Sequence, residues 1–266
     1  MVSFVQKDNY SIDDLVEIVR LLRGEGGCPW DREQTHESIR ADFIEEVSEA
    51  VEAIDLKDTA LLREELGDVL LQVVFHSQIE TENNGFDFNA VCDEVCKKLI
   101  LRHPHVFGDV SVSNSEEVLK NWDKIKQKSK GQDSYTQTLE SVSKALPALM
   151  RAEKVGKRAA RAGMDFDNAQ GAFDCIGTET EELRQAVCEG NQEAIADEMG
   201  DLFFSCVNTA RKLGVNSELA LTAATNKFIK RFAKVEELVR LDGIDMQSLS
   251  IDELDVYWRK AKNLFR

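Results

Sequence analysis

Two acidic motifs occur in the first half of this chain at spacings that suit metal chemistry. Glu45-Glu46-Val47-Ser48-Glu49 is followed, after fifteen residues, by Glu65-Leu66-Gly67-Asp68. Glu46 and Glu49 are three residues apart, as are Glu65 and Asp68, so each pair shares one face of a helix. If a short connection makes the two helices antiparallel neighbours, the four carboxylates converge in one groove.

Four carboxylates in one groove need compensation for their charge. Without it they repel one another and do not all stay ionised. A hard divalent cation supplies that compensation, and ligation by oxygen alone suits Mg²⁺ or Mn²⁺. Mg²⁺ usually keeps several waters and shares the phosphates of a substrate. The motifs therefore predict a metal site that binds a polyphosphate.

The same arrangement returns later in the chain. A shift of 133 positions maps Glu46 to Glu179 and Val74 to Val207, with no gap between them. Gly67 and Gly200 belong to this repeat, and glycine within a helix predicts a close approach of helices beside the carboxylates. A single acidic run is usually a solvated helix face, but a repeated pair favours a site. The predicted metal ligands are Glu46, Glu49, Glu65 and Asp68 in the first copy and Glu179, Glu182, Glu198 and Asp201 in the second.

Basic and aromatic residues follow each acidic pair. Two cations one helical turn apart can neutralise an acidic groove without metal, or they can bind the phosphate oxygens of a substrate. A tryptophan at helical spacing is either part of a core or a stacking surface for a base. The candidate substrate contacts are Lys98, Arg102 and Trp122 in the first copy and Lys227, Arg231 and Trp258 in the second.

Other metal-binding patterns are incomplete. Asp165-Phe166-Asp167-Asn168-Ala169 lacks the third ligand of an EF-hand loop. A di-iron bundle needs two Glu-x-x-His pairs, and the chain has one, from Glu33 to His36. Cys28-Pro29-Trp30-Asp31 is a distinctive motif to which its residue types assign no chemistry.

Helical periodicity predicts the elements that position these residues. Apolar stripes predict helices over 12–22, 39–54, 62–73 and 88–99, and Pro147 marks the start of a further helix. Ser11 to Asp14 resembles a capping box, and no alternating strand pattern is found. The polar segment 126–143 predicts a linker. The expected fold is all-α, with duplicated four-helix-bundle-like domains at 1–125 and 144–266.

Composition excludes several classes of partner. The 266 residues are 42% hydrophobic and carry a net charge of −16, which argues against nucleic acid or an anionic membrane surface as the partner. The first seven residues do not resemble a signal peptide, and no apolar run is long enough for a membrane span. The six cysteines fit neither a disulfide framework nor a zinc ribbon. We expect reduced thiols, mostly in the core, and a cytoplasmic protein.

Taken together, these motifs resemble the MazG family of nucleoside triphosphate pyrophosphohydrolases. The resemblance covers nearly the whole chain and includes Gly27-Cys28-Pro29-Trp30-Asp31, Arg102-His103-Pro104-His105-Val106-Phe107 and Leu146-Pro147-Ala148-Leu149 beside the acidic motifs. It implies an all-α fold and Mg²⁺-dependent cleavage of NTPs and dNTPs between the α- and β-phosphates. It also implies a homodimer whose sites borrow residues across the interface, with the second copy as the hydrolytic one.

These expectations define a mechanism. Bound Mg²⁺ lowers the pKa of a water that attacks in line, and a carboxylate takes the proton. The candidate catalytic residues are Glu45, Glu46 and Glu179; Thr178 occupies the place of Glu45 in the second copy. Two rival hypotheses stay open. One or both copies bind nucleotide without turnover, as a sensor or scaffold, or the chain is a helical dimerisation module that binds no nucleotide.

Overall fold

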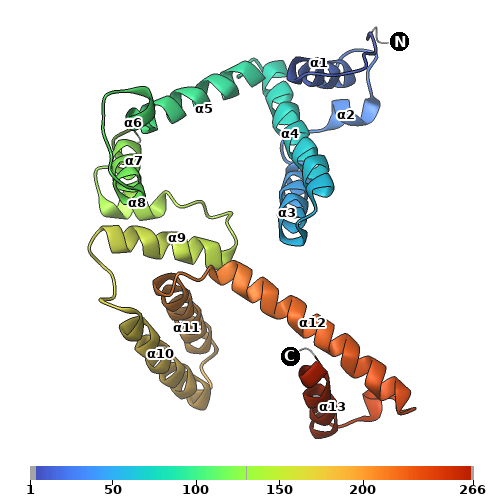
Figure 1. Cartoon of the computed structure of the whole chain (residues 1–266), viewed down its shortest axis with the longest axis vertical. Helices are drawn as coiled ribbons and strands as arrows, with labels where there is room; N and C mark the ends of the chain where they lie inside the picture. The colour runs from blue at the N-terminus through green and yellow to red at the C-terminus, as the bar shows by residue number, and fades with distance from the viewer. Residues whose placement is uncertain (1–3, 130, 265–266) are drawn as a thin grey trace. The chain divides into compact units, whose positions relative to one another are not determined.

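The computed structural model describes residues 4–129 and 131–264, and the chain divides into two compact units, one up to Lys126 and one from Gln127 onward (Figure 1). The described residues form helices and no strand. The all-α fold class is therefore confirmed. No described helix is long and apolar enough to cross a membrane. The first three residues of the amino-terminal segment lie outside the described ranges.

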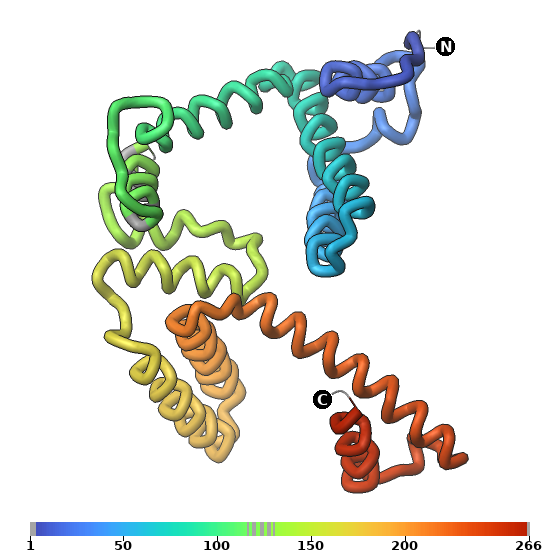
Figure 2. The backbone as a smooth tube through the Cα atoms, in the orientation of Figure 1, coloured from blue at the N-terminus to red at the C-terminus, as the bar shows by residue number. Residues whose placement is uncertain are grey.

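The first unit is built around a helical hairpin. Its first helix starts at the predicted capping box, in which the Ser11 hydroxyl and the Asp14 carboxylate each accept a hydrogen bond from the backbone N–H of the other residue. Figure 2 shows the chain reversing direction between the two hairpin helices, α3 and α4, which pack along their length. The helices are α1 (Ile12–Arg23), α2 (Pro29–Glu33), α3 (Arg40–Leu56), α4 (Thr59–Glu82), α5 (Phe88–Arg102), α6 (Pro104–Phe107) and α7 (Ser115–Ser129).

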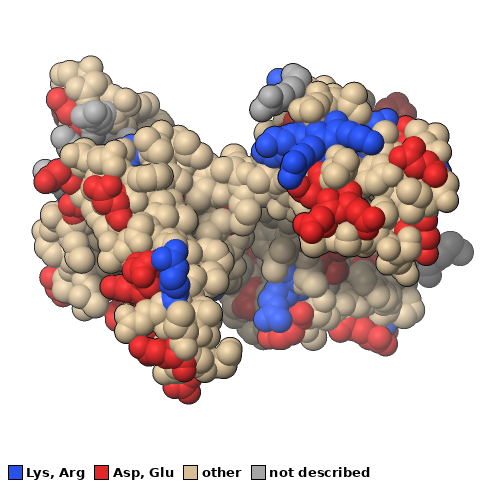
Figure 3. Space-filling model, turned by 90° about the horizontal axis from the view of Figure 1, so that it is seen from below, with Lys and Arg blue, Asp and Glu red and all other residues tan. Residues whose placement is uncertain are grey.

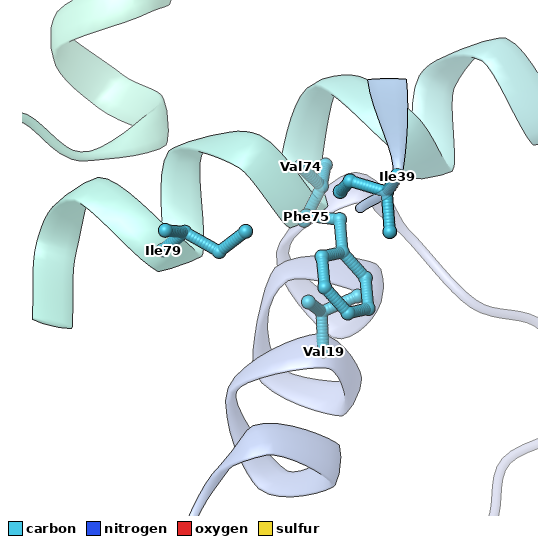
Figure 4. Packing of buried hydrophobic residues seen from close by; sticks show 5 residues of the cluster. All are labelled: Val19, Ile39, Val74, Phe75 and Ile79. Atoms are coloured by element: carbon cyan, nitrogen blue, oxygen red, sulfur yellow. The ribbon is translucent and has the colours of Figure 1, made fainter. Parts of the chain in front are cut away.

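A small apolar core fixes one end of the hairpin. Val19 of α1, Ile39 before α3, and Val74, Phe75 and Ile79 of α4 are buried against one another (Figure 4). Burying each such side chain contributes about 1.5–3 kcal/mol. The core therefore holds α1 against the second half of α4, while the first half of α4 packs against α3.

The Cys28-Pro29-Trp30-Asp31 motif forms the start of α2, next to a buried arginine. The Arg23 guanidinium pairs with both carboxylate oxygens of Glu82, at 2.9 and 2.8 Å. It also donates to the backbone carbonyls of Asp31 and Gln34 and lies over the Phe75 ring. Through Arg23, the backbone of the motif at Asp31 is linked to the end of α4 at Glu82.

The second unit repeats the hairpin with α10 and α11. A second apolar cluster of Val235, Val239, Tyr257 and Ala261 joins the end of α12 to α13. The elements are α8 (Tyr135–Glu140), α9 (Ala148–Arg161), α10 (Ala169–Glu189), α11 (Gln192–Lys212), α12 (Ser217–Leu241), the 3₁₀ turn η1 (Met246–Ser248) and α13 (Ile251–Leu264). As predicted, Pro147 directly precedes a helix, α9.

The turn inside each hairpin is the same. Lys57 ends α3 in the left-handed region, with φ of 57°, and Gly190 ends α10 with φ of 70°. The next residue, Asp58 or Asn191, is the N-cap of the following helix, and its side chain accepts from two backbone N–H groups. Because these positions differ by 133, the repeat extends to backbone conformation.

The polar segment between the two predicted domains is partly helical. The segment 126–143, expected to be a linker, contains the end of α7 and all of α8. Ser134 and Gln137 form a capping box at the start of α8, and the Arg158 guanidinium donates to the Thr138 carbonyl, so local and tertiary contacts both support this short helix.

The cysteines are free, as expected, but they do not lie in the core. Cys28, Cys92 and Cys175 are partly exposed, and Cys96, Cys188 and Cys206 are exposed. The predicted core location was therefore wrong.

Candidate metal and nucleotide site

Each hairpin brings three glutamates together. In the first copy, one carboxylate oxygen each of Glu46 and Glu49 on α3 and of Glu65 on α4 lie within 4.8 Å of one another. The second copy gathers Glu179, Glu182 and Glu198 from α10 and α11 in the same way. The antiparallel hairpin and the three-residue spacing produce this geometry.

The aspartate of each motif also faces its cluster. The pKa of Glu46 is raised by burial and then by the negative charges of Asp68 and Glu49. The pKa of Glu179 is raised by burial and then by the charges of Glu182 and Asp201. Each hairpin therefore directs the four predicted carboxylates to one place.

Crowding in both clusters disfavours the ionised form. Glu65 is only 7% exposed, and burial followed by the charge of Glu49 raises its pKa. Burial followed by the charges of Glu182 and Asp201 raises the pKa of Glu198. Such clusters can hold a hard divalent cation, because it offsets both the burial and the repulsion.

The two copies differ one helical turn after the aspartate. Buried Ser205 donates a side-chain hydrogen bond to Glu179, which opposes the rise in the pKa of that carboxyl. The first copy has Gln72 at this place, and its Oε1 is buried without a hydrogen-bond partner among the described residues. Sequence reasoning missed Ser205, although its position four residues after Asp201 places it on the carboxylate face of α11.

The glycines beside the clusters do not serve close helix packing. A Cβ at Gly67 or at Gly200 would meet no atom within 4 Å, apart from its own helix backbone. The predicted close approach of helices is therefore wrong, and these glycines leave open space next to Asp68 and Asp201.

The predicted substrate contacts of the first copy form a group of their own. The Arg102 guanidinium carbon lies 5.3 Å from the centre of the Trp122 ring, and His103 meets the same ring edge-on at 4.7 Å. The Nε of Arg102 is buried and has no hydrogen-bond partner among the described residues. Lys98 is exposed one turn earlier on α5.

The second copy has a related arrangement. Trp258 packs against the apolar cluster of α12 and α13, with its ring 5.0 Å from that of Phe228. The Nε of Arg231, like that of Arg102, is buried without a partner in the described part of the chain. Lys227 is exposed on α12.

Neither basic group is brought to the carboxylates of its own unit. In the first unit, α5 leads away from the α3–α4 hairpin toward α6, so Arg102 lies at the far end (Figure 1). In the second unit, α12 leads away from α10 and α11 toward α13 (Figure 1). Glu45 is exposed beside the first cluster and contributes to the raised pKa of Glu46, while Thr178 is exposed at the matching place.

Comparison with known proteins matches the duplicated hairpins. A profile described as "MazG nucleotide pyrophosphohydrolase domain" matches residues 34–107 and 169–236. A Thermotoga maritima protein named nucleoside triphosphate pyrophosphohydrolase/pyrophosphatase MazG is 44% identical over 250 residues, covering 94% of this chain and 95% of that protein. The Escherichia coli K12 nucleoside triphosphate pyrophosphohydrolase is 42% identical over 256 residues, covering 94% and 97%.

A solved structure adds a weaker likeness. The crystal structure of a mazG-related protein from Thermotoga maritima is 28% identical, covers 44% of this chain and 99% of its own, and has a TM-score of 0.38. The two domain matches and the full-length relatives identify the family of this chain. By these similarities, the chain belongs to the MazG nucleotide pyrophosphohydrolase family.

Proposed function

We propose that this chain is a nucleoside triphosphate pyrophosphohydrolase that needs Mg²⁺, with Mn²⁺ as a substitute, and releases nucleoside monophosphate and pyrophosphate. The observation that carries the proposal is the duplicated glutamate cluster in a chain whose relatives, similar over 94% of its length, are named for this activity. NTPs and dNTPs are the proposed substrates.

The residues of the clusters fit a hard divalent cation. Every candidate ligand is a carboxylate, and the oxygens of three glutamates per cluster already lie within 4.8 Å of one another. Burial, and then the charges of neighbouring carboxylates, raise the pKa values of Glu46, Glu65, Glu179 and Glu198, and a bound cation would offset both effects. Ligation by oxygen alone favours Mg²⁺ or Mn²⁺ over softer metals.

The proposed chemistry assigns roles to residues of this chain. When bound, Mg²⁺ supplies charge neutralisation on the triphosphate and a lowered pKa of a coordinated water. Glu45, exposed beside the first cluster, takes a proton from the attacking water. The water oxygen bonds to the α-phosphorus as the bond from that phosphorus to the bridging oxygen breaks. The arginines Arg102 and Arg231 stabilise the charge that develops on pyrophosphate.

A homodimer would complete these sites. The chain exposes 18,913 Å², whereas two separate compact domains of half its mass would expose about 14,000 Å² in total. Large apolar side chains on the hairpins and long helices are exposed, such as Ile44 at 65% and Phe228 at 54%. The face drawn in Figure 3 is mostly neither acidic nor basic. A second copy would cover such surfaces and bring cationic helices to the carboxylates.

A second candidate is nucleotide binding without turnover in one copy. Two differences beside the clusters favour it: Thr178 replaces the glutamate found at Glu45, and Gln72 replaces the hydroxyl found at Ser205. Each copy lacks one group that the other has, so the two need not hydrolyse nucleotide equally.

Product analysis on full-length variants tests both candidates. Glu46→Gln with Glu65→Gln disables the first cluster, and Glu179→Gln with Glu198→Gln disables the second. Glu181→Gln is a matched control, because Glu181 is 69% exposed and pairs with Arg184. We expect the unaltered protein and the control to release pyrophosphate when Mg²⁺ is present. The variant that carries all four substitutions should lose this activity. Orthophosphate as the direct product would refute the pyrophosphohydrolase proposal. Full activity in the variant with all four substitutions would refute the assignment of the clusters as its site.

A further inference from the structure

A histidine pair lies on the first hairpin beyond the carboxylate cluster. His36 lies before α3, and His76 is on α4. Their Nδ1 atoms are 2.7 Å apart, and their rings are stacked with centres at 5.0 Å. His36 Nε2 lies 2.8 Å from Glu80 Oε1, one turn further along α4. The ring of Phe43 covers His76.

This cluster is separate from the duplicated site. His76 follows Asp68 by eight residues, a distance of about 12 Å along a helix. The positions that match His36, His76 and Glu80 in the second copy are occupied by Ala169, Thr209 and Leu213. The histidine pair is therefore a property of the first copy alone, and the hydrolase chemistry does not use it.

One assignment of the ring protons satisfies both contacts. Glu80 is an acceptor when ionised, so it accepts a hydrogen bond from His36 Nε2–H, which leaves a lone pair on Nδ1 of a neutral His36 ring. His76 Nδ1 then donates to that lone pair. Burial, and then the charge of His36, lower the pKa of His76, which favours its neutral ring. If the His76 proton moves to Nε2, both Nδ1 atoms present lone pairs to the same place.

We propose that His36 and His76 bind a transition-metal cation such as Cu²⁺, Ni²⁺ or Zn²⁺ through their Nδ1 atoms. Imidazole suits these ions and does not suit Mg²⁺. Metal–nitrogen bonds are about 2.0–2.1 Å long, so nitrogens 2.7 Å apart reach one ion after a small outward shift of the rings. The proton of His76 moves from Nδ1 to Nε2 by exchange with solvent, so that the ring stays neutral, and water fills the other positions of the ion.

Glu80 is the positioning residue of this site. A carboxylate that accepts from the second nitrogen of a ligating histidine fixes its tautomer and ring orientation, and loss of such a partner typically costs about 10–100-fold in metal affinity. The side chains of His36 and Glu80 are 36% and 28% exposed, so an ion can enter from solvent. Binding would connect the segment before α3 directly to α4.

Electron paramagnetic resonance of Cu²⁺ tests the site in the full chain. Saturating Mg²⁺ is present, so that the carboxylate clusters compete less for Cu²⁺. We expect the Cu²⁺ spectrum to show coupling to imidazole nitrogens, and we expect His36→Gln and His76→Gln to remove that coupling. Glu80→Gln should lower the affinity for Cu²⁺ by about 10–100-fold. His105→Gln is the matched control, because His105 contacts His103 instead. Absent nitrogen coupling, or coupling that survives in both variants, would overturn the proposal.

A second measurement on the unaltered protein covers the case in which a variant fails to fold. Diethyl pyrocarbonate modifies accessible histidines, and peptide mass spectrometry locates each modification. Zn²⁺ should slow modification of His36 and His76 while leaving His103 and His105 unchanged. Equal rates with and without Zn²⁺ would also overturn the proposal. Neither readout depends on nucleotide hydrolysis, so failure here leaves the proposed function untouched.

Discussion

The residues of the glutamate clusters were predictable because a helix imposes their geometry. Three-residue spacing fixes a shared face, and the short turn at Lys57 or Gly190 fixes which helices become neighbours. Ser205 and the pair of His36 with His76 were not predictable in the same way. The role of each depends on a contact between separate helices or segments. Spacing places Ser205 on the carboxylate face of α11, but it does not show that the hydroxyl reaches Glu179.

Removing the Ser205 hydroxyl should weaken the second site. Ser205 donates to Glu179 and orients the carboxylate proposed to bind Mg²⁺. In a full chain with the first cluster disabled, we expect Ser205→Ala to lower Mg²⁺ affinity or turnover by about 10–100-fold. Ser205→Thr keeps the hydroxyl and should retain most of the activity. Equal loss in both variants would indicate a packing defect instead.

The raised carboxyl pKa values also predict how the metal-free chain responds to pH. Glu46, Glu65, Glu179 and Glu198 have raised pKa values when folded, so the folded chain binds more protons than the unfolded chain just above the ordinary glutamate range. Their contribution to the free energy of unfolding therefore falls as pH rises through that range.

Mg²⁺ should reverse this loss at neutral pH. A cation at a hundred times its dissociation constant adds about 2.7 kcal/mol per site. Thermal unfolding with and without Mg²⁺ measures the effect, and Glu65→Gln with Glu198→Gln should reduce it. An unchanged melting temperature in saturating Mg²⁺ would contradict binding at the clusters.

At the scale of elements, apolar periodicity predicted α1, α3, α4 and α5, and the repeat extended the hairpin to α10 and α11. Neither signal predicted α7 and α8. Both lie in polar sequence, where a stripe is hard to detect. The capping box of Ser134 and Gln137 was a readable signal for α8. The sequence does not predict the contact from Arg158 to the Thr138 carbonyl, twenty residues away. Polar helices that depend on such contacts are missed by pattern alone.

The hairpin turns allow a matched test of backbone strain. Lys57 adopts the left-handed conformation that Gly190 adopts in the second copy. That conformation costs a residue with a side chain roughly 1–2 kcal/mol. We expect Lys57→Gly to raise the free energy of unfolding by up to about 1 kcal/mol and Gly190→Ala to lower it by a similar amount. Chemical denaturation measures both, and changes of the opposite sign would contradict the shared turn.

At the scale of the whole molecule, the separation of opposite charges within each unit points to assembly. The carboxylates lie on the hairpins, whereas Arg102 and Arg231 lie on helices that lead away from them (Figure 1). A site that needs both groups is incomplete within one unit. If the proposed homodimer completes the sites, a chain lacking all carboxylate clusters and a chain lacking both arginines should each be inactive alone.

Mixing the two inactive chains should then restore activity. Subunit exchange places the intact arginines of one chain beside the intact carboxylates of the other, so pyrophosphate release should appear only after exchange. The measurement is activity against time, with light scattering to follow the oligomeric state. The matched control mixes two chains that both lack the carboxylates, which should stay inactive. If exchange occurs and the complementary mixture remains inactive, the arginines do not serve the carboxylates of another copy.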